Sequence, residues 1–317
     1  MKRALLVGID EYDNFGSLAG CGNDVDALNP LFSRNEDDTP NFDAQTRTSS
    51  TGGVERDPLL KDITALLGPG ADVALFYFAG HGSGTESDVA LVSRDGTEGT
   101  PGIRFSELLT VVATSPVTEI VIVLDCCFAG AAGGIPELAT TTTALRSGVS
   151  ILAASRRDQT AAETEEGRGL FSTFLEGALD GGAADVLGKV TVAGLYSYLD
   201  ESFGAWDQRP AFKANVDRLH ELRRCKPAVP LDQLRQITRF FPAADTVMAL
   251  DPSFEPEAEP RNPENEASFA ILQKYRAAKL LEPVDTEHLY FAAMENKGCR
   301  LTPLGRHYWQ VAHEGRL

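Results

Sequence analysis

The stretch VALFYFAGHG, residues 73–82, decides the fold of this chain together with a second stretch, IVIVLDCCFAG, residues 120–130. Each stretch begins with five to seven apolar residues, many of them β-branched or aromatic, and ends in glycine. Such runs are typical of strands that are buried on both faces of a parallel sheet. Each stretch then places a reactive side chain, an imidazole or a thiol, where the strand is expected to end. The carboxyl edge of an open α/β sheet is the usual place for a functional site.

The rest of the first 217 residues alternates between the patterns of strands and helices. Apolar runs predict strands, and apolar residues at helical spacing predict helices between them. This alternation implies right-handed crossovers and an α/β fold, in which helices cover both faces of a mainly parallel sheet. The further strands are expected at 4–9, 89–92, 148–153 and 208–216, with a short strand at 46–50, and the helices at 23–32, 54–67, 104–113, 169–179 and 191–203.

The last hundred residues carry a different pattern. We expect an α/β domain at 1–217, a helical extension at 218–250, a linker at 251–266 and a small module at 267–317. The linker is expected because its sixteen residues include four prolines and six acidic residues, which favour an extended, self-repelling chain. In the module, Thr302 is expected to cap a last helix. We interpret the module as a small winged-helix-like unit.

The composition is that of a globular protein with an acidic surface. The net charge of −17 argues against nucleic acid as a partner, because phosphates would be repelled. No apolar run approaches the roughly 20 residues that a membrane span needs, and the run at 4–9 is too short for a signal peptide. The five cysteines follow no regular spacing, which indicates a reducing compartment. We therefore expect a cytoplasmic protein without a membrane partner.

His81 and the Cys126-Cys127 pair form a candidate nucleophilic site. A thiol needs a nearby base to become a nucleophile near neutral pH, and histidine is the side chain best suited to accept its proton. Glycines on both sides of His81 allow a sharp turn and the close approach of a substrate. A zinc site is the rival chemistry, but the paired ligand spacing of zinc sites is missing. The structural alternative for His81 is a hydrogen-bonded histidine at a strand end.

These motifs resemble those of the caspase-like cysteine peptidases, and specifically the branch of metacaspases and bacterial caspase homologues. The resemblance covers residues 1–215 and consists of four motifs in the same order. It implies a caspase-like three-layer α/β sandwich and cysteine endopeptidase activity. The motifs are an N-terminal stretch (ALLVGID at 4–10 with LAGCGNDV at 18–25), Gly-His-Gly, Asp-Cys-Cys, and QRPAF at 208–212.

The resemblance assigns a role to each residue of the candidate site. It makes Cys127, the third residue of the Asp-x-Cys motif, the nucleophile and His81 the general base. It also implies that the backbone amides of Gly82 and Cys127 form the oxyanion hole. Cys126 continues the alternation of the strand and is interpreted as a small buried hydrophobe.

Asp24 and Asp125 are the candidates for substrate binding. In metacaspases the matching acidic residues line the pocket for the residue that precedes the cleaved bond. Two carboxylates in a narrow pocket select a cation, and arginine suits them best through bidentate pairing. We therefore expect the partner to be a protein substrate that is cut after Arg or Lys. The structural alternatives are a helix N-cap for Asp24 and a strand-end turn residue for Asp125.

The sequence departs from metacaspases in two places. Phe128-Ala129 stands where His-Ser is common, and residues 85–99 lack the dense acidic run that binds calcium in many metacaspases. We therefore expect no cofactor and no metal. The resemblance implies antiviral defence or programmed cell death in bacteria, and we expect the C-terminal module to recruit or regulate a partner protein. The alternatives are a catalytically weak caspase-like scaffold and a DNA-binding regulator that acts through the C-terminal module.

Overall fold

The computed structural model describes residues 1–84, 88–129, 145–154, 167–203 and 210–317, and of residues 127–129 it describes the backbone alone. The chain divides into two units. Unit 1 comprises Met1–Ala184 and Lys189–Cys225, and unit 2 comprises Asp185–Gly188 and Lys226–Leu317. Within the described residues, no helix combines the length and the apolar character that crossing a membrane requires.

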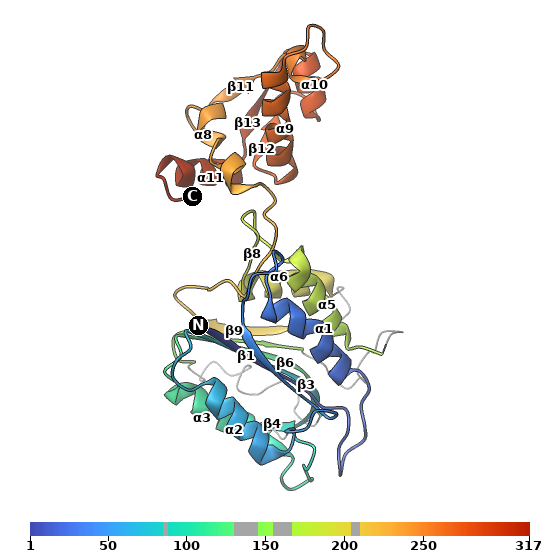
Figure 1. Cartoon of the computed structure of the whole chain (residues 1–317). Helices are drawn as coiled ribbons and strands as arrows, with labels where there is room; N and C mark the ends of the chain where they lie inside the picture. The colour runs from blue at the N-terminus through green and yellow to red at the C-terminus, as the bar shows by residue number, and fades with distance from the viewer. Residues whose placement is uncertain (85–87, 130–144, 155–166, 204–209) are drawn as a thin grey trace. The chain divides into compact units, whose positions relative to one another are not determined.

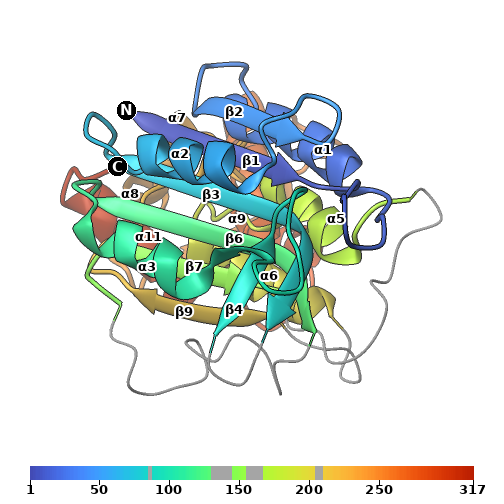
Figure 2. The same cartoon turned by 90° about the horizontal axis from the view of Figure 1, so that it is seen from below.

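Unit 1 is built on a sheet with the strand order β2-β1-β3-β6-β7-β9 (Figure 2). The first five strands in this order run parallel, and β9 is antiparallel to β7. A short pair, β4 and β5, continues from the end of β3. The bounds are β1 (Lys2–Gly8), β2 (Asp43–Thr48), β3 (Val73–Gly84), β4 (Val89–Val92), β5 (Gly102–Arg104), β6 (Glu119–Ala129), β7 (Val149–Ala153) and β9 (Ala211–Asn215), while β8 (Lys189–Val190) and β10 (Arg223–Arg224) form a separate pair.

Helices cover both faces of this sheet (Figures 1 and 2). One face carries α2 (Arg56–Leu66) and α3 (Phe105–Thr114), whose apolar residues belong to one core. The opposite face carries α1 (Cys21–Ser33), α5 (Leu170–Gly177) and α6 (Val192–Ser202), which share a second core. The predicted three-layer α/β sandwich with a mainly parallel sheet is therefore confirmed.

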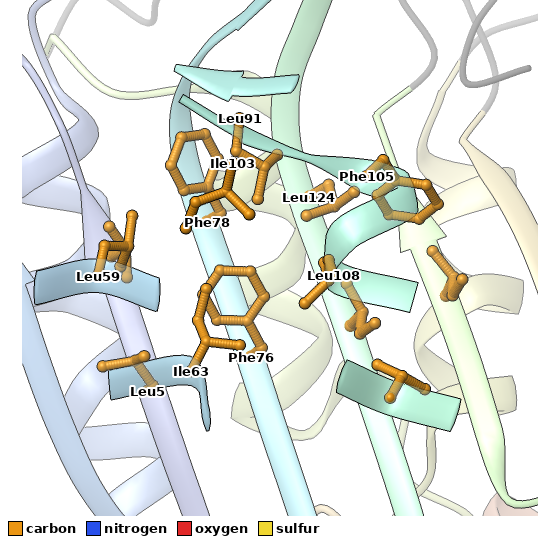
Figure 3. Packing of buried hydrophobic residues seen from close by; sticks show 14 of the residues in the cluster. Leu5, Leu59, Ile63, Phe76, Phe78, Leu91, Ile103, Phe105, Leu108 and Leu124 are labelled. Carbon is orange, nitrogen blue, oxygen red and sulfur yellow. The ribbon is translucent and has the colours of Figure 1, made fainter. Parts of the chain in front are cut away.

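The core under α2 and α3 sets the register of the two central strands (Figure 3). Phe76 and Phe78 of β3 point to the same face as Leu124 of β6, since residues two apart in a strand share a face. Phe76 and Phe78 lie toward Leu59 and Ile63 of α2, whereas Leu124 lies beside Phe105 of α3. Burying each such side chain stabilises the fold by about 1.5–3 kcal/mol. A one-residue slip would expose the whole set, so the pairing of β3 with β6 is strongly specified.

β3 and β6 continue beyond the ends predicted from their apolar runs. The runs stop at Ala79 and Leu124, whereas the pairing extends to Ser83 opposite Ala129. Backbone hydrogen bonds between neighbouring strands do not depend on the type of side chain. The two motifs therefore lie within the paired strands and not after them.

Unit 2 combines a three-stranded antiparallel sheet, in the order β11-β13-β12, with several helices. Thr302 caps the last helix, α11, as predicted: its side chain accepts a hydrogen bond from the amide of Gly305. The winged-helix interpretation stays a prediction. The elements are α7 (Leu231–Leu234), α8 (Ile237–Phe240), β11 (Val247–Ala249), α9 (Pro263–Ala277), β12 (Leu281–Pro283), α10 (Leu289–Met294), β13 (Gly298–Leu301) and α11 (Pro303–His313).

The division into units differs from the expected one. Val229, Phe241 and Phe254 are buried in the core of unit 2, so this core includes both the expected extension and part of the expected linker. Strand β11 pairs with β13, which belongs to the expected C-terminal module. Prolines and acidic residues at 251–266 predicted a linker, but Phe254 is buried in the core of unit 2 and the end of this segment forms the first turn of α9.

A chain that ends at Ala249 is therefore expected to aggregate or be degraded, whereas one that ends at Cys225 stays folded. The longer chain keeps apolar residues such as Ile237 and Phe241 but loses the helices and strands that bury them. The chain that ends at Cys225 lacks most of the core of unit 2, and it keeps the two cores of unit 1 complete. Limited proteolysis with mass spectrometry and thermal unfolding would compare the two. Unfolding of the chain that ends at Cys225 would show that unit 1 depends on unit 2.

Candidate active site

The pairing of β3 with β6 brings His81 and Cys127 side by side. The two residues are directly paired in the parallel register, next to the pair Gly80 and Cys126. Neighbouring strands lie about 4.8 Å apart, so the backbones of His81 and Cys127 are immediate neighbours. The side chain of Cys127 lies outside the described part of the structure, and its role as nucleophile stays a prediction.

Cys126 belongs to the core and not to the surface. It is 4% exposed and shares its core with Ile122 and Leu124, which precede it at intervals of two residues along β6. This is the buried position that the alternation of the strand predicts.

The loop between β1 and α1 orients the His81 imidazole. Nε2 of His81 lies 2.8 Å from the carbonyl oxygen of Gly16. Because a carbonyl oxygen can only accept, Nε2 carries the proton in this contact, and Nδ1 is the unprotonated nitrogen of the neutral ring. The contact therefore selects the tautomer in which Nδ1 acts as a base.

Asp24 of α1 and Asp125 of β6 come together at the start of α5. A Cβ atom at Gly169 would lie 3.0 Å from Oδ2 of Asp24 and 2.8 Å from Oδ2 of Asp125, so a larger residue there would push at least one of the two carboxylates aside. Asp24 is 2% exposed. Burial raises the pKa of Asp24 to about 7, and the nearby charge of Asp125 acts in the same direction. We call Asp24 and Asp125 the acidic pair.

Asp24 binds two groups that precede or begin α5. Its Oδ1 accepts a hydrogen bond from Nε of Arg168 at 3.0 Å, and its Oδ2 accepts one from the amide of Gly169 at 3.1 Å. The Arg168 guanidinium also contacts Glu176 through Nη1. Asp24 is not the N-cap of its own helix, because that position belongs to Gly20.

Asp125 is fixed by a buried hydroxyl chain. Ser172 of α5 donates from Oγ to Oδ2 of Asp125 at 2.6 Å, and the Tyr77 hydroxyl lies 2.6 Å from the same Oγ. Because Ser172 uses its proton on the carboxylate, its oxygen accepts from Tyr77. Asp125 is not a turn residue either, since β6 continues to Ala129.

The raised pKa of Asp24 predicts a pH-dependent contribution to stability. Between the ordinary value of 3.8 and the folded value of about 7, the folded protein keeps a proton that the unfolded chain has released. The free energy of unfolding should therefore fall as the pH rises through this window and level off above it. Asp24→Asn cannot titrate, so its stability relative to the wild type should improve as the pH rises. Thermal unfolding of both proteins from about pH 4 to about pH 8 measures this difference, and parallel curves would contradict it.

The remaining predicted residues lie in or near these strands. Gly82 follows His81 on β3 and is paired with Leu91 of β4. The use of the Gly82 and Cys127 amides as oxyanion donors stays a prediction.

Acidic side chains of the segment at 85–99 are engaged by the chain itself. Asp88 accepts a hydrogen bond from Ser106 at 2.8 Å, and Asp95 accepts one from the amide of Arg56 at 2.9 Å. Glu86 lies outside the described residues. Among the residues that are described, no group of three or more His, Cys, Asp or Glu side chains is arranged to bind a metal ion.

Gly16, Arg168 and Ser172 are among the residues of this site that were not predicted from the sequence. Gly16 acts through its backbone carbonyl, which leaves no signal in a sequence. Arg168 lies 144 residues after Asp24, and Ser172 lies 47 residues after Asp125. No local pattern connects residues so far apart, so only the fold identifies them.

Residues 1–216 match the sequence model of the caspase domain. Among solved structures, the crystal structure of caspase-1 from Spodoptera frugiperda is similar over 70% of this chain and 92% of that chain, with a TM-score of 0.51 and 13% sequence identity. At this identity the similarity concerns the fold. A comparison with curated protein sequences finds no significant match.

Proposed function

The chain belongs to the caspase-domain family of cysteine peptidases, and on this basis we propose that it is a cysteine endopeptidase that uses His81 and Cys127 and cleaves protein substrates after Arg or Lys. One observation carries the proposal: His81 and Cys127 are directly paired on β3 and β6. The contact of Nε2 with Gly16 supports it further, because it leaves Nδ1 as the base.

The proposed reaction has two stages. Nδ1 of His81 takes the proton of the Cys127 thiol, and the thiolate attacks the carbonyl carbon of the scissile bond. The amides of Gly82 and Cys127 donate to the oxyanion that forms. The C–N bond then breaks, the imidazolium protonates the leaving amine, and an acyl-enzyme remains. Water, deprotonated by His81, hydrolyses the thioester and releases the carboxylic acid and the thiol.

The acidic pair supports a preference for basic residues. Two carboxylates in a mostly buried position favour a cation and repel an acidic side chain. The contact between Asp24 and Arg168 adds support, because this carboxylate already accepts a guanidinium at 3.0 Å. A substrate guanidinium at Asp24 would share the carboxylate with Arg168 or displace it, and Arg168 has a second acidic contact in Glu176.

The resemblance to bacterial caspase homologues supports a cytoplasmic role in antiviral defence or programmed cell death. We assign the recruitment or regulation of a partner protein to unit 2. Its helix α10 supports this assignment by exposing three large apolar side chains, Tyr290, Phe291 and Met294, each more than two-fifths exposed.

The proposal is tested with fluorogenic peptides that carry Arg, Lys or Asp before the cleaved bond. We expect hydrolysis of the Arg and Lys peptides and none of the Asp peptide. An electrophile with an arginine side chain should label Cys127, and mass spectrometry would identify the modified residue. Cleavage after Asp would overturn the specificity. Absence of both hydrolysis and labelling would favour the scaffold alternative.

A further inference from the structure

The backbone of β3 has a gap in its pairing beside the candidate base. On this side of β3, the pairing with β1 ends at Gly8 opposite Ala79, and the pairing with β4 begins only at Gly82. Gly80 and His81 lie between these two ladders. A strand amide without an acceptor costs free energy, so the His81 amide needs a partner from elsewhere.

Tyr12 supplies that partner. Its hydroxyl oxygen accepts a hydrogen bond from the His81 amide at 2.8 Å. Its ring centroid lies 4.8 Å from that of the imidazole. Gly80 leaves room for this contact, because a Cβ atom there would lie 2.7 Å from the Tyr12 hydroxyl oxygen. One side chain, only 9% exposed, thus contacts both the backbone and the ring of His81.

The loop that carries Tyr12 is itself firmly attached. The Ser49 hydroxyl accepts hydrogen bonds from the amides of Asp10 and Glu11, both at 3.0 Å. The Asp10 carboxylate accepts two more, at 2.8 and 2.9 Å, from the first two amides of α1. The same loop contributes the Gly16 carbonyl that binds Nε2 of His81. The imidazole is therefore held by a loop that is fastened on both sides of Tyr12.

We propose that Tyr12 is a positioning residue that fixes the direction of the His81 imidazole, an inference that rests on the proposed peptidase function. The hydroxyl sets the backbone of His81, the ring restricts the rotation of the imidazole, and Gly16 binds Nε2. Tyr12 acts through His81 and not on the substrate. Burial raises the pKa of Tyr12 well above its usual range, so the hydroxyl stays neutral.

Tyr12→Phe in the full-length chain tests the proposal, since it removes the hydroxyl and keeps the ring. We expect kcat for an Arg peptide to fall about tenfold, with KM changed less than about twofold, because positioning affects the transition state more than substrate binding. The acidic limb of the pH–rate profile, which reports the base, should be displaced. The matched control is Tyr275→Phe, which deletes a buried hydroxyl bonded to the Gln233 carbonyl in unit 2. It should leave kcat and the pH profile unchanged.

Gly80→Ala provides a second, independent perturbation. The added methyl group would meet the Tyr12 hydroxyl at 2.7 Å and Phe78 at 3.0 Å. Gly80→Ala should lower kcat in the wild type. It should lower kcat by a smaller factor in Tyr12→Phe, because that variant has no hydroxyl oxygen for the methyl group to displace. Strictly additive effects of the two substitutions would overturn the inference. If Tyr12→Phe does not fold, Gly80→Ala alone must still lower kcat without a matching change in KM.

Failure of this inference is distinguishable from failure of the proposed function. A wild-type chain that cleaves none of the peptides refutes the function itself. A wild-type chain that is active, together with Tyr12→Phe behaving like Tyr275→Phe, refutes only the role of Tyr12.

Discussion

Replacing Cys127 or His81 with alanine is expected to lower kcat/KM for an Arg peptide by about 10⁴-fold or more. The nucleophile and the base act as one unit, so losing either removes most of the catalysis that both supply. Cys126→Ala should keep most of the activity, because Cys126 is 4% exposed in the core and points to the opposite face of β6 from Asp125. The substitution should lower only the free energy of unfolding, by about 1 kcal/mol.

All three variants are compared by fluorogenic peptide hydrolysis and by thermal unfolding. Cys126→Ala is the matched control, since it also removes one thiol from the same motif. Loss of activity in Cys126→Ala with full activity in Cys127→Ala would refute the assignment of the nucleophile. Unfolding of His81→Ala would call for His81→Asn, which preserves much of the shape and polarity of the imidazole.

Asp125→Ala is expected to reduce the turnover of Arg peptides at least about tenfold. Asp125 would pair with the guanidinium of the substrate, and removing one partner of a desolvated charge pair costs about 2–5 kcal/mol of binding free energy. The loss should be smaller for Ser172→Ala, which keeps the Asp125 carboxylate and removes only the hydroxyl that donates to it. Asp24→Asn should also lower the turnover of Arg peptides, since an amide oxygen carries no full charge for a guanidinium.

The same peptide panel measures these effects, with kcat and KM determined separately. Asp57→Asn is the control, because its side chain is 90% exposed on α2 and contacts Arg56 only at the surface. Unchanged turnover of Arg peptides in both Asp125→Ala and Asp24→Asn would exclude the acidic pair from substrate binding. The pair would then serve only to fasten the start of α5 to β6 and α1.

Much of unit 1 could be predicted because its strands have strong local signals. The apolar runs of β3 and β6 are buried on both faces, and a run of that kind has few other interpretations. β2 was expected at 46–50 and lies at Asp43–Thr48. Among the described strands it pairs with β1 alone and forms the edge of the sheet, so its side chains are mostly polar and its ends are poorly marked.

The sequence by itself determined the α/β class, the two central strands and the placement of His81 and Cys127 toward the carboxyl ends of those strands, since these follow from local apolar runs and from the rules of parallel sheets. Only the tertiary structure decided that Arg168 contacts Asp24 and that the Tyr12 hydroxyl accepts the amide of His81. It also decided that Phe254 fastens an acidic, proline-rich segment to the core of unit 2. The reason is physical: these contacts join distant segments or use backbone groups, and a backbone amide or carbonyl is the same in every residue except proline.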